Sequence, residues 1–184
     1  TLTEDISVAQ ASDVLGASYN ISDTAETVAA AMIAEDAYGV NGAQSITTTN
    51  DGTVGSVSLS FAEADALLNG TANASQTGTD PEDVTVTDDI SVAQAIDVSG
   101  ATYNISDEAA AIADALLADS AVVDEAVTVT ATAGPVELSY AQANAILNDT
   151  TSVSIDETAI TVSGTISVAQ ASYVLGCLLY TSPS

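Results

Sequence analysis

The sequence predicts an α/β protein built as a tandem-repeat array or solenoid of short strands and short capped helices. Three observations support this prediction. The segment "ISVAQA" occurs from Ile6 and from Ile90, and "ISVAQAS" returns from Ile166. A related segment occurs between these copies, as "LSFAEADALLNGT" from Leu59 and "LSYAQANAILNDT" from Leu138. Val- and Thr-rich stretches of strand character alternate with stretches of helical periodicity. Because such short units bury little on their own, neighbouring units are expected to stack.

Each of these five segments carries a helix-start signal, Ser-x-x-(Gln/Glu). In this capping box the Ser oxygen accepts a hydrogen bond from the third helical amide, and the Gln or Glu side chain reaches back to the Ser amide. Recurrence at five equivalent places predicts five short helices. The pairs are Ser7 with Gln10, Ser60 with Glu63, Ser91 with Gln94, Ser139 with Gln142, and Ser167 with Gln170. Helix ends are expected near Gly16, Asn69, Gly100 and Asn148.

The next elements in chain order are a strand and a longer helix. "YNISD", at 19–23 and 103–107, alternates like a strand, with Tyr19 and Tyr103 as packing residues. Helices are predicted within 23–36 and 107–120, with Asp23 or Asp107 as the N-cap. Their apolar residues follow i, i+3, i+4, i+7, i+8 spacing: Ala25, Val28, Ala29, Met32 and Ile33, then Ala109, Ile112, Ala113, Leu116 and Leu117.

Further strands complete the pattern. They are expected at 45–49 and 126–132, at "VSLS" and "VELS" before the second type of helix, and at 83–88 and 159–164. Turns are expected at 50–52 and 133–135. The alternative architecture is two small α+β repeat domains of roughly 80 residues each, a size within the range of small single domains. In that case 73–83, "NASQTGTDPED", is the stretch most typical of a linker.

The repeats divide the chain into four segments. Residues 1–83 are predicted to form repeat unit 1, residues 84–164 repeat unit 2, and residues 165–176 the start of a truncated unit 3. The remaining residues, 177–184, read "CLLYTSPS", match no part of the repeat, and resemble a translated sequencing adapter. We interpret them as a non-native tail of a metagenomic fragment, which leaves no cysteine in the repeats. Because the chain begins in mid-pattern, we expect an internal fragment.

The charge is strongly one-sided, with 26 Asp and Glu and no Lys, Arg or His, a net charge of -26. Charged residues make up 14% of the chain, against about 25% in an average domain. The acidic content is therefore ordinary, and the absence of basic residues is the unusual feature. No side-chain salt bridge can form. Carboxylates must therefore be solvated, hydrogen-bonded, helix-capping or paired with dissolved cations. Nucleic acid and anionic membranes are excluded as partners, because binding them requires basic side chains.

The same composition argues against catalysis. Without His, Lys, Arg or a native Cys, no Ser-His-Asp, Cys-His or His-based zinc arrangement can be assembled. A pair of carboxylates could still act on glycosides. However, the chain has no Trp and little aromatic surface on which a sugar could stack. We therefore predict no enzyme and no resident cofactor.

Calcium is the ligand that this composition favours, because Ca²⁺ binds carboxylate and carbonyl oxygens. Smaller acidic clusters lie at Asp119, Asp124 and Glu125, and at 156–157. None of the clusters has EF-hand spacing, and solvated acidic loops are the simpler explanation for any one of them. The densest cluster, and thus the candidate calcium site, is "DPEDVTVTDD", with Asp80, Glu82, Asp83, Asp88 and Asp89.

Residues 1–176 resemble repeats of very large bacterial cell-surface or secreted proteins, including marine adhesin-like chains. The resemblance rests on "ISVAQA", "YNISD", the "VTVT" strands and "LSYAQANAILN". It implies a non-catalytic structural spacer at the cell surface or in the extracellular medium, whose partners are neighbouring repeats and dissolved cations. The alternative is a calcium-dependent adhesion or binding module. The G-G-x-G-x-D calcium arrays found in many such chains do not occur in this sequence.

Overall fold

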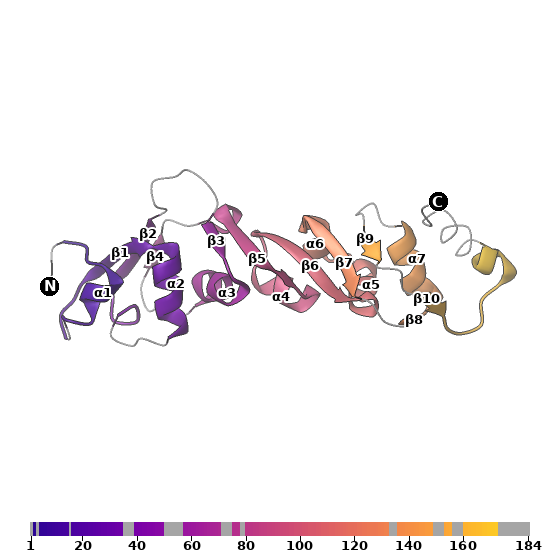
Figure 1. Ribbon diagram of the computed structural model, residues 1–184, viewed down its shortest axis with the longest axis horizontal. Coiled ribbons are helices and arrows are strands. Elements are labelled where there is room, and N and C mark those ends of the chain that lie inside the picture. The colour runs from indigo at the N-terminus through magenta and orange to yellow at the C-terminus, as the bar shows by residue number, and fades with distance from the viewer. Residues whose placement is uncertain are drawn as a thin grey trace. The chain divides into compact units, whose positions relative to one another are not determined.

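A computed structural model describes residues 2, 4–14, 16–34, 39–49, 57–70, 75–77, 80–132, 136–148, 153–155 and 160–172. Within these residues the protein is a mixed α/β structure whose strand pairs are parallel (Figure 1). The chain divides into two compact units, Thr1–Asp88 with Ile96–Tyr103, and Asp89–Ala95 with Asn104–Ser184. The predicted turns at 50–52 and 133–135 lie outside the described residues, as do 156–157 and the tail 177–184.

Eight helices lie in the described part of the chain. They are α1 (Val8–Ala11), α2 (Ala25–Ile33), α3 (Phe61–Asn69), the 3₁₀ helix η1 (Pro81–Asp83), α4 (Val92–Asp97), α5 (Ala109–Leu117), α6 (Ala121–Glu125) and α7 (Tyr140–Asn148). A further helical turn occupies 168–172. The ends predicted at Asn69 and Asn148 are confirmed. Gly16 and Gly100 have φ of 80° and 90°, but the helices before them end earlier, at Ala11 and Asp97.

The first sheet has the strand order β1-β2-β4. Its strands are β1 (Asn20–Thr24), β2 (Ser45–Thr49) and β4 (Ser75–Thr77). In register, Ile21 lies opposite Ile46, and Ser45 lies opposite Ser75. Strand β4 and helix η1 both come from 73–83, the stretch whose composition suggested a linker. Its three-residue strand was too short and too polar to be predicted from the sequence pattern.

The largest sheet has five strands in the order β3-β5-β6-β7-β9. In this sheet β3 pairs with β5, β6 with β7, and β7 with β9. A two-stranded sheet pairs β8 with β10. The bounds are β3 (Val57–Leu59), β5 (Val84–Ile90), β6 (Thr102–Glu108), β7 (Thr128–Thr132), β8 (Val136–Leu138), β9 (Val153–Ile155) and β10 (Ile160–Val162).

The longer helices bury the faces that their spacing predicts, except in the last turn. Helix α2 buries Ala25, Val28 and Ala29 and contacts α3. Helix α5 likewise buries Ala109, Ile112 and Ala113 and contacts α7. The predicted apolar positions Ile33 and Leu117 are instead 48% and 52% exposed, because each lies at the end of its helix.

Small aliphatic side chains form the core of each unit. Ile21, Val28 and Ile46 are fully buried in the first unit, and Ile105, Ile112 and Leu138 in the second. Tyr19 and Tyr103 are also buried, which confirms their predicted packing role, and the Tyr19 hydroxyl donates to the Gly39 carbonyl oxygen at 3.0 Å.

Candidate functional site

The five predicted helix starts all form complete capping boxes. The backbone amide of each Ser donates to its Gln or Glu side chain at 2.8–2.9 Å, for the serines at 7, 60, 91, 139 and 167. The amide of each Gln or Glu donates to the Ser Oγ at 3.2–3.4 Å. Each box satisfies two of the amides that a helix start leaves without intrahelical partners. These polar residues therefore have a structural role.

Recurring aspartates bind a third amide at three of these helix starts. Asp23 Oδ2 accepts from the Val8 amide at 3.0 Å, and Asp107 Oδ2 accepts from the Val92 amide at 2.9 Å. In the related segment, Asp88 Oδ2 accepts from the Phe61 amide at 2.8 Å. Each acceptor lies on a strand, β1, β5 or β6, that runs beside the segment before the helix, 15 or 27 residues further along the chain. We call this contact the aspartate clamp.

The clamp corrects the predicted role of Asp23 and Asp107. They are not the N-caps of the helices that follow them, because strands β1 and β6 continue to Thr24 and Glu108, which take the N-cap positions. The second carboxylate oxygen of each aspartate instead accepts from the next backbone amide, that of Thr24 at 2.9 Å and that of Glu108 at 2.7 Å. One carboxylate thus joins the starts of two successive helices, where its charge complements the helix dipoles.

Glu63 is the one acidic member among the five capping boxes. Hydrogen bonds from the Ser60 hydroxyl and the Ser60 amide lower the pKa of Glu63 below its usual value, outweighing partial burial and the nearby Asp88 charge. The Ser60 hydroxyl lies 2.7 Å from Glu63 Oε2. Because the charged form is the better acceptor, this box is strongest above the ordinary pKa of a glutamate.

The predicted calcium cluster lies around η1 and along β5. Asp80 and Glu82 are exposed, Asp83 is half-buried, and Asp88 and Asp89 are exposed on β5. Across the described residues, no group of three or more acidic, His or Cys side chains lies close enough together to hold a metal ion. Asp88 is engaged in the clamp to Phe61. The structure therefore does not gather these five carboxylates into one site.

A polar pocket lies instead in the second unit, where the end of α5, the start of α6 and the end of α7 meet. Its volume is about 370 Å³. It is lined by Leu116, Asp119, Ser120, Asp124, Asn144, Ala145 and Asn148. The lining thus includes two acidic residues, one serine and two asparagines beside Leu116 and Ala145. This set of oxygen atoms suits a hard cation or a ligand rich in hydroxyl groups.

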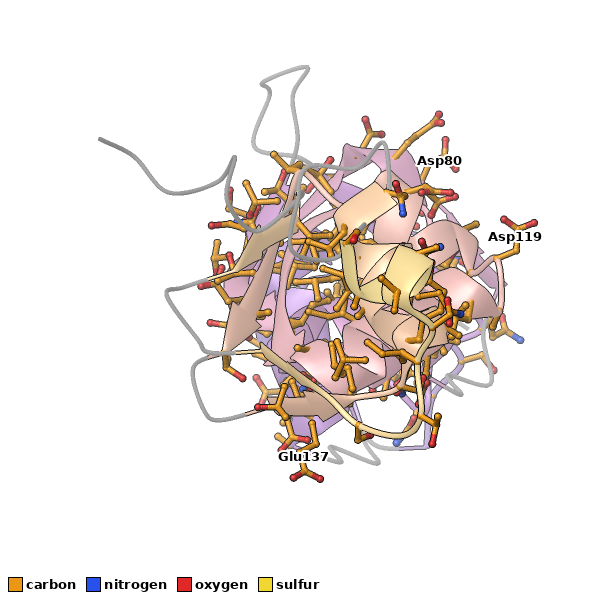
Figure 2. All side chains as sticks on the ribbon, turned by 90° about the vertical axis from the view of Figure 1, so that its right-hand side faces the viewer. Asp80, Asp119 and Glu137 are labelled. Atoms are coloured by element: carbon orange, nitrogen blue, oxygen red, sulfur yellow. The ribbon has the colours of Figure 1, made fainter. Side chains whose placement is uncertain are left out.

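Asp119, at the edge of the pocket, has an unusual backbone conformation. It is the only non-glycine residue with positive φ in the described part of the chain, at 55°. The Ser120 amide donates to the Ala115 carbonyl at 3.0 Å and the Asp119 amide donates to the Leu116 carbonyl at 3.1 Å, the pattern of a Schellman motif. Figure 2 shows the Asp119 carboxylate projecting away from the ribbon.

The α7 side of the pocket is held by side-chain hydrogen bonds. Asn148 Nδ2 donates to the backbone oxygen and to Oδ1 of Asn144, each at 2.8 Å. Gln142 Nε2 donates to Asp114 Oδ1 at 2.7 Å and so links α7 to α5. The sequence pattern indicates Asp119 and Asp124 as a minor acidic cluster but gives no sign of the two asparagines. They lie some twenty residues further along the chain, and their i, i+4 spacing on one helix face is the signal that could have identified them.

None of the helices in the described ranges is long and apolar enough to cross a membrane. Comparisons with protein-family models, with curated proteins and with solved structures found no match for this chain.

Proposed function

We propose that the chain is a non-catalytic structural spacer within a large repetitive protein of the cell surface or extracellular medium. The observation that carries this proposal is the recurrence of one assembly pattern within the chain. The pairing β1-β2-β4 recurs as β6-β7-β9, and the pairing of β3 with β5 recurs as that of β8 with β10. The α2–α3 contact corresponds to the α5–α7 contact.

The polar side chains that recur along the chain stabilise the helix starts within these recurring strand and helix arrangements. The capping boxes and aspartate clamps account for the Ser, Gln and Asp residues that repeat most regularly in the sequence. In a catalytic or ligand-binding protein, such recurring polar residues would be expected to converge on a cleft. Here they converge on helix starts instead. This arrangement favours a repeated structural module in a tandem array over a site-bearing enzyme.

The charge supports an extracellular, saline setting. A net charge of -26 without any basic residue destabilises the compact chain through self-repulsion. Salt screens that repulsion, because the Debye length falls from about 10 Å at 0.1 M ionic strength to about 3 Å at 1 M. Dissolved cations are therefore the partners of this surface, and a salt-rich medium stabilises the fold.

A second candidate function is calcium-dependent binding, which the pocket of Asp119 and Asp124 favours. Ca²⁺ takes six to eight oxygen ligands, and carboxylates, carboxamides and hydroxyls all line this pocket. Calcium bound there would join the end of α5, the start of α6 and α7. It would thereby stabilise the folded second unit by mass action.

Thermal melting in NaCl and in CaCl₂ at matched ionic strength tests both functions. The spacer predicts the same rise in Tm with either salt. A calcium site predicts an additional calcium-specific rise, since occupancy at one hundred times Kd stabilises by about 2.7 kcal/mol, or roughly 5–10 °C for a chain of this size. Asp124→Asn should abolish that extra rise, and Asp89→Asn, which removes one exposed charge elsewhere, should leave it intact. A calcium-specific rise lost only in Asp124→Asn would refute the simple spacer.

A further inference from the structure

The chain contains two Asn-Gly pairs, Asn41-Gly42 and Asn69-Gly70, which lie in different surroundings. In such a pair the glycine amide nitrogen can attack the side-chain carbonyl carbon of the asparagine, because glycine has no Cβ to hinder the approach. The reaction requires a glycine amide that is not held in another hydrogen bond and an asparagine side chain that can turn. The hydrogen bonds at each pair therefore decide which of the two can react.

The Asn69-Gly70 pair is held at the end of α3. The Gly70 amide donates to the Ala66 carbonyl oxygen at 2.9 Å, as the C-cap of the helix. The Asn69 side-chain amide donates to Asp65 Oδ1 at 3.0 Å and also to the backbone oxygen of Asp97. Attack by the Gly70 nitrogen would break the bond at the helix end and the side-chain bonds together, so the fold protects this pair.

The Asn41-Gly42 pair lies in an exposed turn. The Ala43 amide donates to the Val40 carbonyl oxygen at 3.3 Å, so Asn41 and Gly42 are the two central residues of the turn. Val40 and Ala43 are only 1% and 6% exposed, whereas both central residues are exposed to solvent. Among the described residues, neither the Gly42 amide nor the Asn41 carboxamide has a hydrogen-bond partner. The attacking nitrogen and the reacting carboxamide are therefore both available to each other and to water.

We infer that Asn41 is a site of spontaneous deamidation in the folded protein. The Gly42 nitrogen forms a bond to Asn41 Cγ, the bond from Cγ to Nδ2 breaks, and ammonia leaves with the proton of the Gly42 amide. Water then opens the resulting cyclic imide at one of its two carbonyl carbons and leaves aspartate or isoaspartate. The new acid is ionised at neutral pH, so the net charge becomes more negative than -26. The inference does not depend on the spacer function.

The second unit already has an aspartate at the corresponding place. Asn41 lies four residues before the first residue of β2, and Asp124 lies four residues before the first residue of β7. Strands β2 and β7 correspond, because each pairs in parallel with the strand of a "YNISD" segment in the same register. The residues just before, Val40 and Val123, are both buried. The fold of such a unit is therefore compatible with the aspartate that deamidation creates.

The test follows the full chain during incubation at neutral pH and physiological temperature. Glu63 lies between the two pairs, so a glutamate-specific protease releases them in separate peptides, in which mass spectrometry detects acid in place of amide. We expect conversion at Asn41 to be about tenfold faster than at Asn69 or more, because one hydrogen bond can change a rate by about that factor. Part of the product should be isoaspartate, which an isoaspartyl methyltransferase labels.

Two controls separate the effect of the fold from that of the sequence. In guanidinium chloride both pairs lose their hydrogen bonds, so the rates at Asn41 and Asn69 should become similar. Gly42→Ala should slow the conversion of Asn41 in the folded chain and leave that of Asn69 unchanged, because a Cβ hinders attack by the nitrogen of residue 42. Equal rates at the two asparagines in the folded chain, no conversion at Asn41, a difference that persists in guanidinium chloride, or unchanged conversion in Gly42→Ala would each overturn the inference.

Discussion

Removal of the Asp107 carboxylate gives the most direct test of the aspartate clamp. Asp107→Ala deletes two hydrogen bonds, to the Val92 amide at 2.9 Å and to the Glu108 amide at 2.7 Å. Loss of a helix-capping acceptor costs about 1 kcal/mol, and the site is half-buried, so water replaces only part of the interaction. We therefore expect a loss of about 2 kcal/mol in the free energy of unfolding for the two contacts together.

The control must separate the lost contacts from the relief of charge repulsion. Asp89→Ala removes the same charge from an exposed position on β5 and measures that relief alone. The difference between the two variants in urea unfolding should be about 2 kcal/mol, and about 4–8 °C in Tm. Asp107→Asn keeps one acceptor oxygen and should lose about half as much. Hydrogen exchange should quicken at the Val92 amide in Asp107→Ala. A difference below about 0.5 kcal/mol between Asp107→Ala and Asp89→Ala would refute the clamp as a stabilising contact.

Three further perturbations follow from single contacts. Asp119→Gly should raise the free energy of unfolding by about 1 kcal/mol, because glycine has no steric penalty at positive φ; a decrease in thermal melting would contradict the Schellman assignment. Tyr19→Phe should cost about 1 kcal/mol in urea unfolding by removing the donor to the buried Gly39 carbonyl, and an unchanged midpoint would argue against that bond. Glu63→Gln should cost about 0.5 kcal/mol near pH 7. The folded pKa of Glu63 is lowered, so its contribution is present above the unfolded pKa of about 4.3 and is lost as the pH falls through the folded value. Stability measured against pH should show the two proteins converging as the pH falls below the unfolded pKa and through the lower folded pKa of Glu63, and a constant difference would show that charge is not involved.

The features that could be predicted from sequence are those encoded within a few residues. A Ser and a Gln three positions apart determine a capping box, so all five helix starts were predicted and are confirmed. Strand β2 begins and ends where its Thr-rich segment indicates, at Ser45 and Thr49. The buried helix positions Val28 and Ile112 follow from 3.6-residue periodicity. In each case the physical cause lies within one turn or one strand.

Contacts between residues far apart in the sequence could not be predicted in the same way. Asp23 lies directly before a helical stretch, where local rules predict an N-cap. Its carboxylate instead accepts a hydrogen bond from the Val8 amide, at the start of a helix 15 residues earlier in the chain. The pocket beside Asp119 depends on how α5, α6 and α7 pack, and α6 itself, at Ala121–Glu125, is too short for periodicity to reveal. The three-residue strands β4 and β9 were missed because their residues gain strand character only by pairing with β2 and β7.

The parallel registers have a consequence for how the polypeptide reaches its native state. Paired residues are separated by 24 positions in the pair Asn104 and Thr128, and by 30 in the pair Ser45 and Ser75. Separations of this size are those of ordinary parallel crossover units, and they keep the loop-closure entropy lower than pairing across the whole chain would. In these pairs the second strand is synthesised only 24 to 30 residues after the first, so we expect the chain to fold progressively from its N-terminal side during synthesis.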